Sequence, residues 1–188
     1  MINVLYEKFP ESIVIENTGY PVVTDFRDWI AFFDMINDPG LLPKDVVKAS
    51  LSWYRDKIPP DIIAAYNGLI SFAQADDIHY KHNNKNSGQN NCKKQIVSYL
   101  YDSPYILGAF RQVYGINLRE TEYMHWYEFC ALFDALPEDT PIKKRMSYRA
   151  VNTAGIKDRA EQKRIRKIQR EISFPCKALS AADIGSMF

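Results

Sequence analysis

The stretch YDSPYILGAFRQVYGINLRETEYMHWYEFCALFDALPEDTPIKKRMSYR, residues 101–149, indicates the fold more clearly than any other part of the chain. Apolar side chains recur in it at the three- to four-residue spacing of amphipathic helices, over 105–114 and again over 124–136. Three local signals mark helix ends: Ser103-Pro104 as a start, Gly115 as an end, and Thr121 with Glu122 as a second start. The stretch has no recognisable nucleophile, metal set or phosphate loop, which points to packing and binding.

The composition is that of a folded chain. Of the 188 residues, 46% are hydrophobic and 13% aromatic, which is enough for one domain with a substantial core. No apolar run approaches the roughly 18–20 residues that a membrane span needs. The first residues, MINVLYEKFPESI, lack the long apolar segment of a secretory signal. We therefore expect a cytoplasmic protein that does not enter a membrane.

The N-terminal part predicts a β-hairpin followed by helices. Residues 12–16 are rich in β-formers, Asn17-Thr18-Gly19 is a turn signal, and residues 20–23 return with Pro21 at an edge position. Thr24 is the expected N-cap of a helix that ends near residue 37. Two further helices are predicted, one opened by Pro43 and one from Asp61 to about residue 75.

The predicted organisation is a single, mainly α domain, residues 1–188, with a short N-terminal β-hairpin. An N-terminal lobe covers about 1–75, and a helical C-terminal lobe covers about 95–172. Residues 76–94, DDIHYKHNNKNSGQNNCKK, are polar and Asn-rich, so we expect a mobile loop between the lobes. Residues 173–188 are expected to form a flexible tail. No internal repeat of convincing period is visible.

Charge is distributed unevenly along the chain. Residues 1–77 carry 6 basic and 12 acidic side chains, residues 78–142 carry 6 and 7, and residues 143–188 carry 12 and 4. The net charge of +1 therefore conceals an acidic start of −6 and a basic end of +8. Such a chain can recruit nucleic acid, an acidic partner, or the acidic part of a neighbouring copy in a head-to-tail homo-oligomer.

Residues 157–172, KDRAEQKRIRKIQREI, predict a charged helix with a narrow apolar stripe of Ile165, Ile168 and Ile172. A stripe of this width suits one partner groove. The candidate partner-binding residues are this stripe and three nearby cations, Arg164, Lys167 and Arg149. The basic stripe also allows phosphate binding, but aromatic residues for base stacking are missing from its helical part, which disfavours nucleic acid as the main partner.

Few residues suggest chemistry, and we predict no catalytic, cofactor-binding or metal residues. His79 and His82 with Asp76 and Asp77 form at most an accidental polar cluster. His125 lacks a neighbouring nucleophile and is better explained as a helix-capping or packing residue. Three distant cysteines, among them Cys130 in an apolar context, argue against disulfides and zinc. The nucleotide-binding, hydrolase and zinc-protease motifs are absent. An enzyme without a recognisable motif is the remaining alternative.

Several segments together resemble the bacteriophage gene-product-fifteen family. They are YDSPYI at 101–106, AFxxxYGIxL at 109–118, MHWYEFxALF at 124–133, Leu-Pro at 136–137, IPPD at 58–61, Tyr-Arg at 148–149, and the hairpin leading into TDFRxW at 24–29. The resemblance covers roughly residues 10–172 and is weakest in the Asn-rich loop.

The resemblance implies a tail protein of long-tailed phages that infect Gram-positive bacteria, acting as a tail assembly chaperone in the host cytoplasm. Such a protein is not catalytic. Its expected partners are the tape-measure protein, whose long apolar helices it keeps soluble, and the tail-tube protein. A nucleic-acid-binding accessory protein is the second interpretation.

Overall fold

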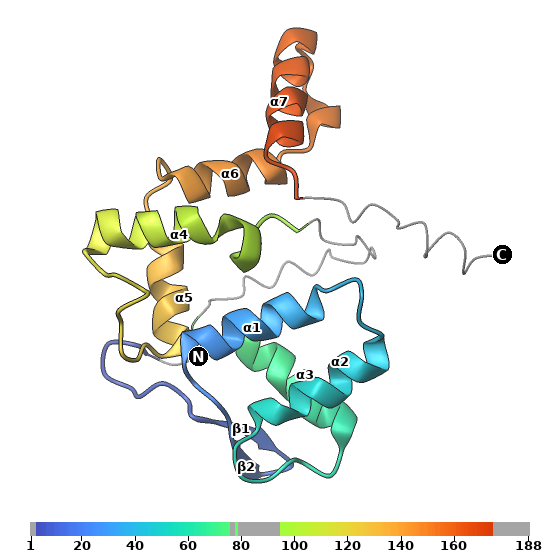
Figure 1. Cartoon of the computed structure of the whole chain (residues 1–188), viewed down its shortest axis with the longest axis vertical. Helices are drawn as coiled ribbons and strands as arrows, with labels where there is room; N and C mark the ends of the chain where they lie inside the picture. Colours follow the sequence, from blue (N-terminus) through green and yellow to red (C-terminus); the bar gives the residue numbers. More distant parts are fainter. Residues whose placement is uncertain (1–2, 76–77, 79–94, 175–188) are drawn as a thin grey trace, which may run out of the picture.

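The computed structural model describes residues 3–75, 78 and 95–174 (Figure 1). Within these residues the chain is mainly α with a two-stranded antiparallel sheet near the N-terminus, which confirms the predicted fold class. The elements are β1 (Ser12–Ile15), β2 (Thr18–Pro21), α1 (Phe26–Ile36), α2 (Pro43–Ser50), the 3-10 turn η1 (Leu51–Trp53), α3 (Ile62–Ala73), α4 (Tyr99–Tyr114), α5 (Trp126–Asp134), α6 (Pro141–Ala150), the 3-10 turn η2 (Thr153–Gly155) and α7 (Arg159–Glu171). The predicted loop 76–94, apart from Ile78, and the tail beyond Phe174 lie outside the described residues.

The β-hairpin turns one residue earlier than predicted. Its turn residues are Glu16 and Asn17, with φ of +48° and +64°, because a two-residue turn with both φ angles positive matches the twist of the strands. The hairpin lies on α3 at Gly68. A Cβ atom there would stand 2.7 Å from the Ile13 side chain, so glycine permits the close approach of strand and helix.

Helix α1 is capped by Asp25, and the prediction of Thr24 as N-cap is wrong by one residue. The Asp25 side chain accepts a hydrogen bond from the Arg27 backbone N–H at 2.9 Å. Thr24 is buried and serves another contact, because its hydroxyl lies 2.9 Å from the hydroxyl of Tyr123.

Helix α4 is one continuous helix, where the sequence suggested a short helix and a new start at Ser103-Pro104. Ser98 caps it, and Pro104 lies in its interior. Proline has no N–H for the carbonyl four residues earlier, which belongs to Leu100. The Ser103 hydroxyl donates to that carbonyl at 3.0 Å, so the helix continues through the proline.

The remaining helix ends follow the sequence with one exception. Gly115 ends α4 in the left-handed conformation, with φ of +71°, and Pro43 opens α2, both as predicted. The exception is α5, which begins at Trp126 and is capped by His125, so Thr121 with Glu122 is not its start.

One aromatic core joins the two halves of the chain. Trp29 of α1 stacks on Phe72 of α3 at 4.8 Å between ring centroids, and on Trp126 of α5 at 6.4 Å. Phe129 of α5 stacks on Phe110 of α4 at 5.1 Å. All five rings are at most 4% exposed, and they belong to one continuous buried cluster. The N-terminal and C-terminal segments therefore share their core.

The order of elements occurs twice, which corrects the expectation that no internal repeat is present. We call α1–α2–η1–α3 the first unit and α5–α6–η2–α7 the second unit. Proline opens α2 and α6, at Pro43 and Pro141, and aspartate caps α3 and α7, at Asp61 and Asp158. Helices α1 and α5 also correspond in sequence at a spacing of 100 residues: Phe26 with Trp126, Asp28 with Glu128, Trp29 with Phe129, Ala31 with Ala131, Phe33 with Phe133, and Asp34 with Asp134.

The two units meet through a reciprocal pair of backbone hydrogen bonds. Phe26 N–H donates to the Met124 carbonyl at 3.0 Å, and Trp126 N–H donates to the Thr24 carbonyl at 2.7 Å. The pairing places Asp25 opposite His125 in an antiparallel bridge. Phe26 corresponds to Trp126 and Thr24 to Met124, so each bond is the equivalent of the other with the units exchanged. The contact is therefore two-fold symmetric at the level of the backbone.

Candidate interaction surfaces

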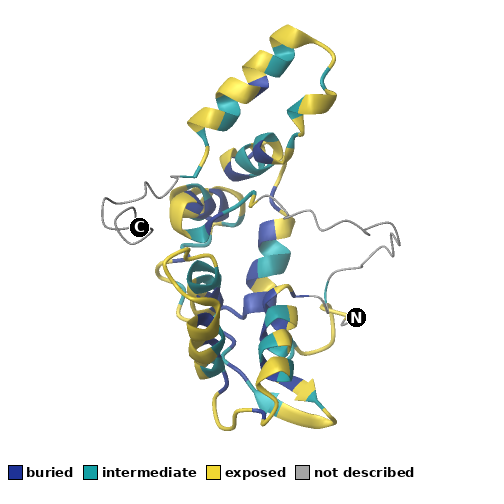
Figure 2. Ribbon diagram, turned by 90° about the vertical axis from the view of Figure 1, so that its right-hand side faces the viewer, coloured by how far each residue is buried: buried dark blue, intermediate teal, exposed yellow. Residues whose placement is uncertain are grey.

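Helix α7 and the turn before it, residues 157–172, extend from one end of the molecule, and we call them the arm (Figure 1). Its helix is mostly exposed, whereas α3, its counterpart in the first unit, buries Leu69 and Phe72 in the core (Figure 2). The arm is therefore the part of the described chain that is most open to a partner.

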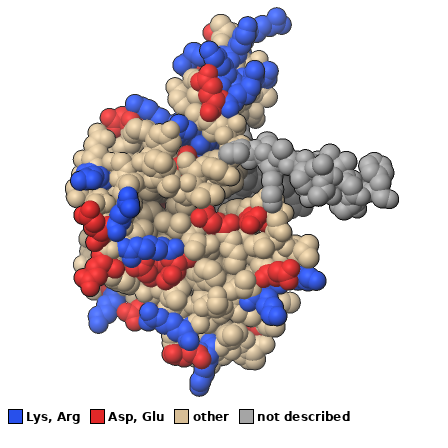
Figure 3. Space-filling view, in the orientation of Figure 1, with Lys and Arg blue, Asp and Glu red and all other residues tan. Residues whose placement is uncertain are grey.

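The outward face of the arm is cationic. Arg159, Lys163, Arg166, Lys167 and Arg170 are all exposed, and Lys and Arg side chains dominate this end of the molecule in Figure 3. Lys167 approaches Glu171 at 4.0 Å. Among the described residues, no carboxylate lies within ion-pair distance of the other four. These cations are available to an external acidic group.

The predicted isoleucine stripe lies on the side of α7 that faces α6 and η2 of the same chain. Ile165 is 6% exposed, and Ile168 and Ile172 are half-buried on the side that packs against α6 and η2. Partner binding through the stripe stays a prediction, but in this structure Ile165 has an intramolecular role. Of the predicted cations, Arg164 is exposed and pairs with Glu161 at 2.7 Å, and Lys167 is 79% exposed.

Polar side chains complete the attachment of the arm to α6 and η2. The Gln169 amide donates to the carbonyls of Tyr148 and Val151 at 2.8 and 2.9 Å. The Gln162 amide donates to the Thr153 carbonyl at 2.8 Å. Hydrogen bonds of this kind fix orientation, because their donors and acceptors must be aligned. The arm is consequently held at a defined angle with little apolar burial.

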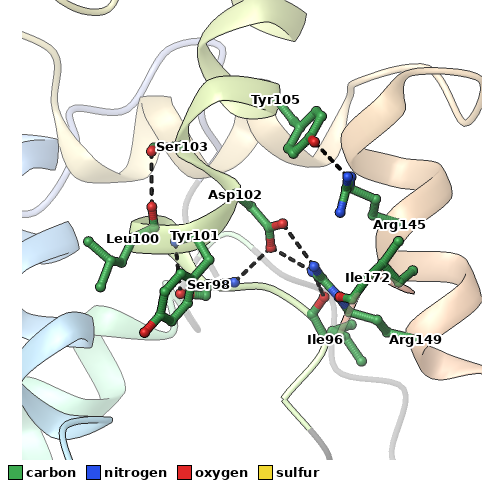
Figure 4. A network of polar contacts seen from close by, with 10 residues as sticks. All are labelled: Ile96, Ser98, Leu100, Tyr101, Asp102, Ser103, Tyr105, Arg145, Arg149 and Ile172. Atoms are coloured by element: carbon green, nitrogen blue, oxygen red, sulfur yellow. Dashed lines mark hydrogen bonds and ion pairs between the residues drawn. The ribbon is translucent and has the colours of Figure 1, made fainter. Parts of the chain in front are cut away.

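Arg149 is buried at the base of the arm, where it binds Asp102 (Figure 4). The two terminal guanidinium nitrogens of Arg149 donate to the two carboxylate oxygens of Asp102 at 2.6 and 3.0 Å. The side chains of Arg149 and Asp102 are 5% and 1% exposed. A bidentate pair at this depth is geometrically specific. The sequence placed Arg149 among the partner-binding residues, which stays a prediction, and in this structure Arg149 has a role inside the chain.

The same guanidinium connects three further parts of the chain. Its Nε donates to the Ile172 carbonyl at the end of α7 at 2.9 Å, and one terminal nitrogen donates to the Ile96 carbonyl at 3.0 Å. Phe174 stacks on it, with the guanidinium carbon 4.1 Å from the ring centroid. Arg149 therefore joins α6, the start of α4 and the end of the arm at one point (Figure 4).

The Asp102 carboxylate accepts several hydrogen bonds, and its position on the apolar face of α4 can be recognised in the sequence. Its carboxylate accepts the Ser98 backbone N–H at 3.0 Å, beside the bonds from Arg149. Along α4 it lies four residues before Ile106, on the helix face that also carries Ala109 and Phe110. A carboxylate on an apolar face indicates a buried cationic partner. The tertiary structure determines which cation pairs with Asp102, and that cation lies 47 residues further along the chain.

Five exposed apolar side chains lie just before α2 and at the start of α3. These elements lie at the end of the body opposite the arm (Figure 1). The large exposed residues are Leu41 and Leu42 before α2, and Ile58, Ile62 and Ile63 before and in the first turn of α3. Ile63 is 74% exposed and Leu42 is 57% exposed. We call these five the α2–α3 apolar residues. Because the core is complete without them, they are available for contact with another molecule.

His125 serves as the N-cap of α5, as the sequence suggested. Its Nδ1 accepts the Tyr127 backbone N–H at 3.0 Å, so Nε2 carries the proton and donates to the Pro10 carbonyl at 3.1 Å. Burial lowers the pKa of His125, although the Pro10 carbonyl and Glu11 act in the opposite direction. The imidazole is therefore neutral and fully used for structure.

The described residues contain neither a metal-binding cluster nor an activated thiol. No three His, Cys, Asp or Glu side chains among the residues that the structure describes are placed to hold a metal ion. Burial raises the pKa of the Cys130 thiol, so the thiolate that a nucleophile requires is disfavoured. His79 and His82 lie outside the described residues. In the part of the chain that is described, no helix is long and apolar enough to cross a bilayer.

A mainly α fold with an exposed cationic arm and exposed apolar residues defines the class of the chain as a helical protein. A family model, described as Bacteriophage Gp15 protein, matches residues 5–174. The match covers most of the chain, so the protein belongs to the bacteriophage Gp15 family, and the predicted resemblance is confirmed at this level. It is thus a phage protein of the structural or assembly class. No curated protein and no solved structure matches the chain.

Proposed function

We propose that this protein is a non-catalytic tail assembly chaperone. In this role it binds the tape-measure protein in the host cytoplasm, keeps its long helices soluble, and brings tail-tube subunits to them. Membership of the Gp15 family supports a role in building the phage. The resemblance in Tyr101–Arg149 carries the narrower role and a Gram-positive host.

The α2–α3 apolar residues are the observation that carries this proposal. Before the tail tube surrounds it, a tape-measure helix exposes an apolar face, which is an aggregation hazard. A chaperone covers such a face with apolar side chains of its own. Ile62 and Ile63 begin α3 on a rigid scaffold, because Asp61 caps the helix and Ala65 and Leu69 anchor it in the core. They are therefore positioned to meet a partner helix without rearrangement.

Co-expression tests the proposal. The tape-measure protein is expressed alone, with this protein, and with the variant Ile62→Glu/Ile63→Glu. Acidic residues suit the first turn of a helix, so the variant is expected to keep α3. We expect wild type to keep the tape-measure protein in the soluble fraction and to co-purify with it, and the variant to lose both effects.

Val14→Glu is the matched control, because Val14 is also apolar and 69% exposed but lies on the hairpin. This variant is expected to behave as wild type. If the tape-measure protein stays insoluble with wild type and nothing co-purifies, the chaperone role is rejected. If Val14→Glu is as defective as the double variant, the α2–α3 apolar residues are not the contact.

Nucleic-acid binding is the second candidate function, and the cationic face of the arm favours it. Four cations without a carboxylate partner in the described residues lie on the outward side of α7. A 13-residue helix is about 20 Å long, which allows it to follow several phosphates. A gel shift with double- and single-stranded oligonucleotides at about 50 mM salt tests this function, because phosphate contacts weaken steeply with salt. A complete lack of shift there rejects it.

A further inference from the structure

The cations of the arm are not required by the architecture of its unit. Helix α3 occupies the corresponding place in the first unit, and its sequence IIAAYNGLISFA contains no charged residue. Helix α7, RAEQKRIRKIQRE, carries six Lys or Arg side chains. The arm is attached by its inner side, through Ile165, Gln162 and Gln169. Of the outward cations, Arg166 takes part in that attachment, because its Nε donates to the Thr153 hydroxyl at 3.2 Å. The other four make no such contact among the described residues, so they serve another purpose.

The rest of the molecule has the complementary charge. Residues 3–75, 78 and 95–142 carry 17 acidic and 8 basic side chains, a net charge of −9. Residues 143–174, which comprise α6, η2 and the arm, carry 3 acidic and 11 basic side chains, a net charge of +8, and the arm itself carries 3 and 7, a net charge of +4. We call the first group the acidic body. Two copies that approach arm to arm, or body to body, repel each other, and two that approach arm to body attract each other.

We infer that the outward face of the arm docks on the acidic body of a second copy of this chain. The arm extends beyond its own body (Figure 1), so its outward cations are accessible to a neighbour. A phosphate backbone is less favoured as the occupant, because the exposed face of α7 has no aromatic side chain for base stacking. The second copy has the required charge on the chain itself.

The contact joins two different surfaces, which determines the type of assembly. The arm of one copy occupies the body of the next, and the arm of that second copy is still free. Such heterologous contacts produce rings where the rotation closes and open chains where it does not. The expected species therefore include oligomers larger than a dimer, and they grow with protein concentration.

Sedimentation velocity of the full chain at about 50 mM and about 500 mM NaCl tests the inference. Screening shortens the range of the attraction to a few ångströms at the higher salt. We expect concentration-dependent oligomers at low salt and a monomer at high salt. A monomer under both conditions, over the concentration range that an assembly factor reaches during expression, overturns the inference.

Charge reversal locates the contact. The arm variant Lys163→Glu/Lys167→Glu/Arg170→Glu changes exposed positions and leaves Ile165, Gln162 and Gln169 in place. Lys44→Glu/Lys48→Glu/Lys57→Glu, at exposed positions in or near α2, changes the net charge by the same amount. We expect the arm variant to stay monomeric at low salt and the control variant to associate. Circular dichroism verifies that both variants keep their helices.

Two other outcomes overturn the inference. If both triple variants lose association equally, net charge and not the arm controls it. If wild type is monomeric and shifts a short oligonucleotide in a manner that the arm variant does not, the arm binds a phosphate backbone. The inference does not depend on the chaperone role, because sedimentation needs no tape-measure protein and the arm variant retains Ile62 and Ile63.

Discussion

The two units, α1–α2–η1–α3 and α5–α6–η2–α7, have the same order of elements, but the third helix is packed into the core in the first unit and extends outward in the second. Their first helices are close in sequence, and Trp29 and Phe129 at corresponding positions are both completely buried. Their third helices diverge, because α3 presents Leu69 and Phe72 to the core where α7 presents one buried isoleucine, Ile165. The composition of the third helix thus determines whether that helix packs into the core of the molecule or extends into solvent.

The attachment of the third helix differs accordingly. In the first unit it is an aromatic contact, the stack of Phe72 on Trp29. In the second unit it is mostly polar: Gln162 and Gln169 bind backbone carbonyls, and Arg149, itself paired with buried Asp102, donates to the carbonyl of Ile172 at the end of α7. An apolar contact tolerates small changes in the side chains that form it. Removal of one partner of a buried ion pair leaves the other charge buried and unpaired, which destabilises the fold. The two units are therefore expected to fail in different ways.

The largest effect is expected from breaking the buried pair. Arg149→Met leaves the Asp102 carboxylate buried without its cation, and we expect a loss of about 3–5 kcal/mol in the free energy of unfolding. Urea denaturation measures it. The double variant Asp102→Leu/Arg149→Met is expected to regain part of the loss, since it removes the unpaired charge. Arg164→Ala, which breaks the exposed pair with Glu161, is the control and is expected to leave the midpoint unchanged. Equal effects of Arg149→Met and Arg164→Ala would contradict this account.

The second prediction compares a buried apolar side chain in each of the third helices, Leu69 in α3 and Ile165 in α7. Leu69→Ala opens a cavity in the shared core, and we expect a loss of about 2–5 kcal/mol in global stability. Ile165→Ala is expected to leave the global urea midpoint nearly unchanged and to speed amide hydrogen exchange in residues 159–171. The reason is that the arm can open while the aromatic core stays folded. A cooperative loss of the whole structure on Ile165→Ala would show that the arm and the body fold as one unit.

The smallest effect concerns the caps of the first helices, Asp25 in the first unit and His125 in the second. The pKa of His125 is lower in the folded state than the ordinary value of 6.5. The unfolded chain therefore binds the proton more readily, so this contribution is fully present above pH 6.5 and is lost as the pH falls through the folded pKa. We expect lower stability at pH 5.5 than at pH 7.5, measured by urea denaturation.

The variant His125→Asn keeps a side-chain acceptor for the cap but cannot titrate. Both forms are compared in a His79→Gln/His82→Gln background, which removes the other imidazoles. The asparagine form is expected to show a smaller difference between the two pH values. The same difference in both forms would assign the pH dependence to groups other than His125.

The sequence predicted the elements well wherever one local signal was present. Pro43, Gly115 and Asp61 each act through their own backbone or an adjacent turn, and each stands where it was expected. The helix starts at Thr24 and Thr121 were wrong because Asp25 and His125 cap those helices, and the start at Ser103 was wrong because α4 already runs from Ser98 through Pro104. The resemblance carried by Tyr101–Arg149 is a property of the sequence alone, and it indicates the correct family.

The candidate sites were harder to predict, because they depend on contacts between distant residues. Arg149 lies in a run of cations and shows no local sign that it is buried, and its partner Asp102 is in another helix. The repeat is hidden in the sequence for a similar reason. Its spacing changes from 100 residues at Trp126 to 97 at Asp158, and the third helices share little composition. The correspondence of α3 and α7 is shown by the order of the elements and by the aspartate cap that begins each helix.

The bond from Arg149 to the Ile172 carbonyl has a mechanical consequence. It closes a loop across 23 residues that contains the whole arm, so the arm is attached at both of its ends. A pull on the tip of the arm is then shared by the end of α6 and by the start of α4, instead of separating α7 one turn at a time. Load applied to the arm by a partner would pass through a single guanidinium directly into the body.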